Sequence, residues 1–185
     1  MSRNIVLYSA FLLIIPIGLI HAKVMAVIGE RIYECEDVPK DQLIKAVDFS
    51  NLKIHQENDT HTYINGSMTF LYGFTRLPGR IYIEQYVRGK WVIQLFDRKY
   101  MDMCFTFHNP AEPFYNQTNH FPSCPVKAGT DWKFDMVHIK GSDRLKENFP
   151  SYWTGLWRMA FILEFQVDGE YKKNCRKVHA DIYEI

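Results

Sequence analysis

The sequence lacks the features by which nucleic-acid-binding proteins and common enzymes are recognised. Lys and Arg number 22 against 21 Asp and Glu, so the formal net charge is only +1 and no basic excess is available for phosphates. The one dense basic cluster, residues 172–177, is expected to be a solvated hairpin end. No Gly-x-Ser-x-Gly elbow, His-Glu-x-x-His pair or glycine-rich phosphate loop occurs. We therefore expect no nucleic-acid partner, no catalytic residue and no enzymatic activity.

Cysteine is scarce too, with four residues in the chain: Cys35, Cys104, Cys124 and Cys175. No two of them have the Cys-x-x-Cys spacing of zinc ribbons and redox sites, so we expect no metal and no cofactor. An even number predicts two disulfides, for which three pairings are possible. A bridge between Cys104 and Cys124 would close the excursion between them. Cys35 would then pair with Cys175 and join the first strand to the last.

Long hydrophobic runs are also rare, because residues 5–20 form the one clear example. This run follows Arg3, is shorter than the ~20 residues of a membrane-spanning helix, and ends before a switch to charged sequence. We predict a secretory signal peptide over residues 1–22, with a retained membrane anchor as the alternative, and a single extracellular domain over residues 23–185. Three Asn-x-Ser/Thr sequons agree with secretion and predict glycosylation at Asn58, Asn65 and Asn116.

Helical periodicity is scarce as well, whereas alternation of apolar and polar residues is common. Such alternation predicts strands, and turns rich in Gly, Pro and Asn separate them. The predicted strands are residues 24–35, 48–56, 63–72, 80–87, 91–96, 132–139, 156–167 and 171–183. Short strands with hairpin turns indicate an all-β fold, an antiparallel β-sandwich. The stretch 99–129 contains four prolines and is expected to be a long loop with a helical turn at 100–105.

The strand predicted at 156–167 carries an unusually bulky apolar stripe. Alternate residues of a strand share a face, which here collects Trp157, Met159, Phe161, Leu163, Phe165 and Val167. Ordinary core packing explains any single one, but a lining so rich in rings and thioethers could hold two sheets apart around a pocket. We predict a cup for an apolar ligand, lined by Met68, Phe70, Ile83, Trp91, Ile93, Phe134, Met136, Trp153, Trp157, Met159, Phe161 and Phe165. We expect Trp91 and Ile93 on the same interior face as the stripe.

The connection before this strand, residues 148–155, holds three aromatic residues: Phe149, Tyr152 and Trp153. Connections between strands face water, so exposed rings there predict a use for them. We expect these rings to control ligand access to the cavity or to dock onto a membrane or partner. A loop folded back as a structural plug is an equally good interpretation.

Two segments of the C-terminal third carry a family resemblance. They are Cys124-Pro125-Val126-Lys127-Ala128-Gly129-Thr130 and Cys175-Arg176-Lys177-Val178-His179-Ala180-Asp181-Ile182. Together with the order of strands and the aromatic loop between them, they resemble the ganglioside-activator branch of the ML lipid-recognition superfamily. Within that branch the chain is most similar to insect chemosensory B proteins.

The resemblance implies an immunoglobulin-like cup whose two sheets splay around a lipid-sized cavity, with the first and last cysteines paired. It also implies a secreted, monomeric binding protein for long-chain lipids or cuticular hydrocarbons that takes part in pheromone or gustatory chemosensation. A chemosensory membrane receptor or channel is then a possible partner. Two alternatives stay open besides an extracellular enzyme: a glycolipid-presenting activator, and an interaction module that docks a receptor without any bound lipid.

Overall fold

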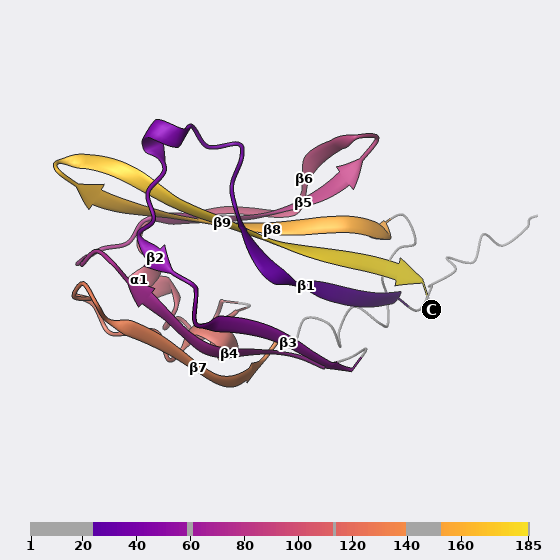
Figure 1. The fold of residues 1–185 in the computed structure, drawn as a ribbon, viewed down its shortest axis with the longest axis horizontal. Helices are drawn as coiled ribbons and strands as arrows, with labels where there is room; N and C mark the ends of the chain where they lie inside the picture. The colour runs from indigo at the N-terminus through magenta and orange to yellow at the C-terminus, as the bar shows by residue number, and fades with distance from the viewer. Residues whose placement is uncertain (1–23, 59–60, 113, 140–152, 185) are drawn as a thin grey trace, which may run out of the picture.

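Two antiparallel sheets face each other in the computed structural model, which describes residues 24–58, 61–112, 114–139 and 153–184 (Figure 1). The first sheet has the strand order β1-β9-β8-β5-β6. Its strands are β1 Val24–Glu34, β9 Glu170–Glu184, β8 Gly155–Val167, β5 Gly79–Val87 and β6 Lys90–Tyr100. β8 and β9 form the long central hairpin of this sheet, so the apolar stripe of β8 lies near its middle.

The second sheet is built around β4, His61–Phe70. β7, Asp131–His138, pairs along one side of β4, while β2, Val47–Asp48, and β3, Leu52–Asn58, share the other side. The strand predicted at 48–56 is therefore two strands, because a turn closed by the hydrogen bond from Leu52 N to Phe49 O interrupts it. This turn brings apolar residues to the edge of the space between the sheets.

The predicted all-β sandwich closed by two disulfides is confirmed. Cys35 is bonded to Cys175 and Cys104 to Cys124, so the first pair joins the end of β1 to β9 and the second closes the excursion between β6 and β7. The expected helical turn is present as α1, Met103–Thr106, which Asp102 caps by accepting from the backbone N–H of Cys104. The sequence did not predict α2, Tyr115–Thr118, or the 3-10 turn η1, Lys40–Gln42.

The excursion of residues 101–130 fills one half of the space between the sheets with aromatic rings. Phe107 and Phe121 enter from the excursion, and their ring centroids are 4.7 Å apart. Both rings also contact Trp132 of β7, at 5.3 Å and 4.9 Å. We call this cluster the ring core; its fully buried or nearly fully buried rings are Phe70, Phe107, Phe121, Trp132, Phe134 and Phe165.

β8 is buried on both faces, which the sequence pattern did not predict. Its inner face supplies the stripe, while Arg158, Ala160 and Ile162 on its outer face are also buried. The segment between β1 and β2 folds over this outer face and carries η1 with it (Figure 1). The register from β8 to β9 runs unbroken and places Cys175 and Val178 on opposite faces of the sheet.

Candidate functional site

One row of apolar side chains crosses the inner face of the first sheet outside the ring core. Met159 of β8 pairs with Val178 of β9 on one side and with Ile83 of β5 on the other. Val178 in turn pairs with Ile32 of β1, and paired residues of antiparallel strands share a face. None of these four side chains is buried, and Met159 is 46% exposed. We call Ile32, Val178, Met159 and Ile83 the open row.

The open row lies between two packed regions of the same inner face. On one side, Phe161 and Ile81 form the next pair along β8 and β5, and both pack in the ring core. On the other side, Trp157 is buried in a small second cluster together with Ile182, and its indole N–H donates to Trp153 O at 2.6 Å. Apolar side chains that stay accessible between two packed clusters are the kind of surface that binds an apolar ligand.

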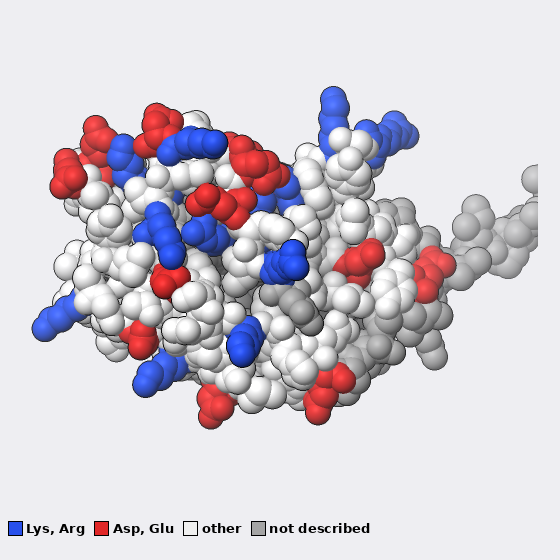
Figure 2. All heavy atoms as spheres, in the orientation of Figure 1, with Lys and Arg blue, Asp and Glu red and all other residues white. Residues whose placement is uncertain are grey.

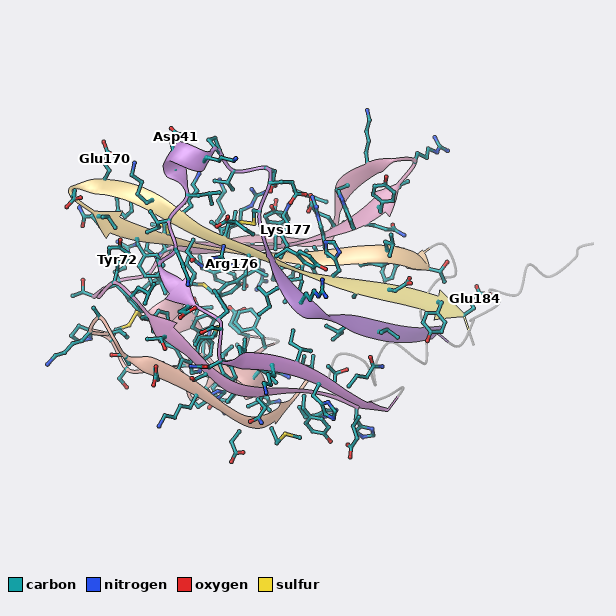
Figure 3. The ribbon with its side chains drawn as sticks, viewed as in Figure 1. Asp41, Tyr72, Glu170, Arg176, Lys177 and Glu184 are labelled. Carbon is teal, nitrogen blue, oxygen red and sulfur yellow. A yellow bond between two sulfur atoms is a disulfide. The ribbon has the colours of Figure 1, made fainter. Side chains whose placement is uncertain are left out.

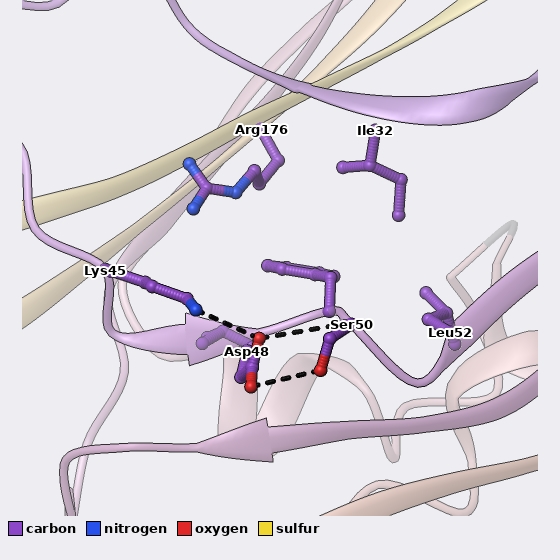
Figure 4. Close-up of a pocket in the computed structure, with 8 residues that line it drawn as sticks. Ile32, Lys45, Asp48, Ser50, Leu52 and Arg176 are labelled. Atoms are coloured by element: carbon purple, nitrogen blue, oxygen red, sulfur yellow. Dashed lines mark hydrogen bonds and ion pairs between the residues drawn. The ribbon is translucent and has the colours of Figure 1, made fainter.

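At the β1 end, the open row reaches a cleft of about 290 Å³ between the two sheets. Figure 4 shows Ile32 and Arg176 pointing from the first sheet toward Leu52 and Asp48 across the gap. The cleft is lined by Ile32, Lys45, Val47, Asp48, Phe49, Ser50, Leu52 and Arg176. This volume is at the lower end of the ~300–1,000 Å³ typical of small-molecule sites. Both sheets contribute apolar walls, so the cleft is a true inter-sheet opening.

Asn174 of β9 holds the β2 wall of this cleft in place. Its side chain is fully buried, and its Oδ1 accepts from the backbone N–H groups of Ala46 and Val47 at 3.2 Å and 3.3 Å. A further backbone bond, from Ile44 N to Lys173 O, attaches the preceding residues to β9. The position of Val47 beside the cleft therefore depends on an amide side chain in the other sheet.

Arg176 is the cationic side chain that faces the cleft from β9, on the opposite side of the strand from its neighbour Lys177 (Figure 3). Its side chain is 14% exposed, and its Nη1 lies 2.9 Å from Glu34 Oε1 and 3.0 Å from Cys175 O. The guanidinium carbon is 5.6 Å from the centre of the Phe49 ring. Among the described residues, no acceptor receives a hydrogen bond from its Nε or Nη2.

The rim of the cleft carries a second, more exposed ion pair. The Lys45 ammonium lies 3.2 Å from Asp48 Oδ1, and the Ser50 hydroxyl and amide also donate to this carboxylate (Figure 4). The bond from Lys45, followed by the bond from the Ser50 amide, lowers the pKa of Asp48. The rim therefore presents both signs of charge close to the apolar walls, and Asp48 stays ionised at neutral pH.

A second hollow, of about 600 Å³, lies within the bend of residues 34–45. It is lined by Glu34, Cys35, Glu36, Val38, Lys40, Leu43, Ile44 and Lys45. All of these residues come from one continuous segment that starts at the end of β1, and half of them are charged. This hollow is a concavity of the covering segment and not a space between the sheets.

The twelve predicted ligand-binding residues are distributed over several environments, and none lines either hollow. Those in or against the ring core are Met68, Phe70, Phe134, Phe161 and Phe165. Trp153, Trp157 and Ile83 lie in or against the second cluster. Ile83 also belongs to the open row, as does Met159. Met136 is exposed and has a left-handed backbone, φ 46°, beside an irregularity in the pairing of β4 with β7. Ligand contact by these residues stays a prediction.

The expectation that Trp91 and Ile93 share the interior with the stripe is wrong. Ile93 pairs with Glu84, and Glu84 pairs with Arg158 on the outer face of β8. Trp91 lies on that outer face too, with the Arg158 guanidinium 4.1 Å from its ring centre. Alternation within β6 predicts that Trp91 and Ile93 share a face, but the register against β5 decides which face of the sheet that is.

The outer face contains a network of ion pairs instead of a solvated surface. Arg158 donates to Glu84 at 2.6 Å and to Glu36, and Lys177 lies 2.7 Å from Asp37. Burial by itself would lower the pKa of Arg158, but the carboxylates of Glu84 and Glu36 outweigh burial and raise the pKa. Burial first, then the Asp37 carboxylate, raises the pKa of Tyr82, which donates to Asp37. The network fixes the segment after β1 onto the sheet.

Other predicted features lie partly outside the described residues. This holds for the signal peptide, for Phe149 and Tyr152 of the aromatic loop, and for the side chain of Asn58, whereas Asn65 and Asn116 are exposed.

In the part of the chain that is described, no helix is long and apolar enough to span a membrane. Nor do three or more His, Cys, Asp or Glu side chains gather there as a metal site. Figure 2 shows Lys and Arg interspersed with Asp and Glu over the visible face.

No protein-family model matches this chain, and no curated protein matches it. The likeness to chemosensory B proteins, and with it the ML-type lipid cup, therefore stays a prediction that rests on the two C-terminal segments. The cleft itself was missed by sequence reasoning. Its apolar walls, such as Phe49 and Leu52, come from a turn between two short strands and follow no recognisable pattern.

Proposed function

We propose that this protein is an extracellular binding protein for a hydrophobic ligand of the long-chain lipid class, without catalytic activity. The observation that carries the proposal is the open row, which runs from Ile83 across the inner face to the inter-sheet cleft at Ile32. An alkyl chain could lie along the row and enter through the cleft. A role in pheromone or gustatory chemosensation follows from the family resemblance alone.

The energetics favour a loosely selective apolar site. Burying one methylene contributes about 0.8 kcal/mol, so ten methylenes supply roughly 8 kcal/mol before the cost of ordering the ligand. Met159 at the centre of the row is an unbranched, polarisable side chain that adapts to ligands of different shape. Long-chain lipids and cuticular hydrocarbons both fit this description.

Uptake of N-phenyl-1-naphthylamine, a neutral apolar fluorophore, tests the proposal. Wild-type protein should bind the probe, and Met159→Lys should weaken binding about tenfold or more, because an ammonium would replace apolar surface in the row. Met101→Lys is the matched control, since Met101 is 75% exposed and lies outside the row. Absence of probe uptake by the wild type, or equal loss in both variants, would contradict the proposal.

A receptor-docking module is the second candidate, and one observation favours it. Rings form a ladder across the outer face: Tyr33 stacks on His179 at 4.9 Å, His179 lies 5.6 Å from Trp91, and Trp91 lies 5.1 Å from Tyr86. Tyr33 and Tyr86 are both exposed. Exposed rings of this kind are frequent in protein interfaces.

Replacing Tyr33 and Tyr86 together by Ser distinguishes the two candidates. Under the lipid-binding proposal, probe affinity stays within about twofold of wild type, because neither ring contacts the open row. Under the docking alternative, the double variant no longer binds chemosensory membranes. The wild type binds them even though it contains no bound or extractable lipid. A native mass spectrum of the purified wild-type protein shows directly whether lipid is bound.

A further inference from the structure

The position of Arg176 narrows the class of ligand. The register pairs Arg176 with Glu34 of β1 and with Phe161 of β8, so it occupies the row directly beside the open row. It therefore stands between the closed ring core and the accessible apolar surface. Because it also lines the cleft, a ligand chain that entered there and lay along the open row would have one end beside this guanidinium.

The guanidinium has hydrogen-bonding capacity that the described protein does not use. Nη1 is occupied by Glu34 and by the Cys175 carbonyl, and Phe49 lies near the guanidinium carbon. The Nε and Nη2 groups donate to no acceptor among the described residues, although only 14% of the side chain is exposed. These two groups form the edge of the guanidinium that binds a carboxylate or phosphate through two parallel hydrogen bonds.

We infer that the ligand is an anionic amphiphile, whose acidic head binds the Nε–Nη2 edge of Arg176 while its alkyl chain occupies the open row. This inference rests on the proposed function and adds the chemistry of the ligand's head. A fatty-acid carboxylate fits best, because Glu34 already neutralises part of the arginine charge and the cleft is small. A neutral hydrocarbon bound in the cleft would desolvate the donor edge without offering it an acceptor.

Displacement of N-phenyl-1-naphthylamine by dodecanoic acid and by 1-dodecanol tests the inference, because these competitors differ in the head alone. We expect wild type to bind the acid about 10- to 100-fold more tightly than the alcohol. Arg176→Gln should abolish this preference while the alcohol still binds. Arg80→Gln is the matched control: Arg80 is also a strand arginine that forms an ion pair with a carboxylate, Asp97, but it pairs with Ile162 on the outer face. It should keep the wild-type preference.

A second variant acts in the opposite direction and does not depend on removing a partly buried side chain. Glu34→Gln takes away the carboxylate that competes for the guanidinium, and Glu34 is largely exposed. Dodecanoic acid should then bind about 2- to 5-fold more tightly, with 1-dodecanol unchanged. Thermal unfolding of each variant confirms that the comparison is made on folded protein.

The outcomes separate this inference from the proposed function. If wild type takes up the neutral probe but binds acid and alcohol equally, the anionic head is wrong and the hydrophobic site stands. If the probe is not taken up at all, both fail. Displacement of the probe by millimolar acetate or inorganic phosphate would also overturn the inference, because it would show a site for free anions that needs no alkyl chain.

Discussion

The two halves of the inner face differ in what fills them. In one half, the excursion of residues 101–130 inserts Phe107 and Phe121 between the sheets, and the rings close the space. In the other half, the open row consists of aliphatic side chains and Met159, which remains 46% exposed, and the cleft adds charged side chains and the ring of Phe49. The comparison shows that the rings packed against one another mark the closed half, whereas the accessible surface is largely aliphatic and charged.

The largest expected effect comes from a substitution in the closed half. Phe107→Ala should lower the free energy of unfolding by about 3–5 kcal/mol, since Phe107 is fully buried among other rings and cannot be replaced by water. Met159→Ala, in the open half, should cost about 1 kcal/mol or less. Urea unfolding of both variants measures the difference. Equal costs would mean that the two halves are packed alike.

Removing the Cys104–Cys124 bridge should come next in size. It closes a span of 20 residues, for which loop entropy predicts a stabilisation of about 3 kcal/mol. The paired substitution of both cysteines by Ser should also loosen the excursion and increase uptake of the apolar probe, because the ring core would open. A stable variant with unchanged uptake would show that packing alone keeps this half closed.

Asn174→Ala tests the difference between the two halves at the cleft, where the open half ends. The substitution leaves the backbone N–H groups of Ala46 and Val47 without their buried acceptor, which should cost about 1–3 kcal/mol. We also expect weaker probe binding, because Val47 forms a wall of the cleft. Thr118→Ala is a useful control: Thr118 is likewise buried and donates to Phe107 O, but in the closed half. It should lower stability without changing probe affinity.

The smallest effect concerns pH and the outer face. Burial alone would raise the pKa of Asp37, but its hydrogen bonds with Lys177 and then Tyr82 outweigh this and lower it below its ordinary value of 3.8. A carboxyl with a lowered pKa contributes its full stabilisation above the ordinary value and loses it as the pH falls through the lowered one. Stability should therefore decrease below about pH 4.

Asp37→Asn should flatten this acid dependence while leaving probe affinity at neutral pH unchanged. The measurement is the urea midpoint as a function of pH, for wild type and variant. An unchanged acid slope in the variant would assign the acid sensitivity to other carboxylates. Altered probe binding would connect the outer-face network to the open half, which the structure separates by the thickness of the sheet.

The sequence by itself indicated most of the strands, the sandwich and the disulfide pairing that the structure has. Alternation and turn residues depend on local chemistry, so they located the long β8–β9 hairpin and the inward face of Met68 and Phe70. The pairing of Cys35 with Cys175 followed from strand order once the other bridge was assigned to the excursion. The strands and turns are features that neighbouring residues specify, whereas the Cys35–Cys175 pair joins residues 140 apart and followed from the number of cysteines and the strand order.

Only the tertiary structure decided which apolar residues are accessible. Trp91 and Ile93 show the same alternation as Ile83, yet they lie on the opposite face, because the register of β6 against β5 places Trp91 beside Tyr86 and Ile93 beside Glu84. The cleft likewise combines β1, β9 and the turn before β3, which meet through long-range pairing. Accessibility is a property of what packs above a side chain, and periodicity within one strand contains no information about that.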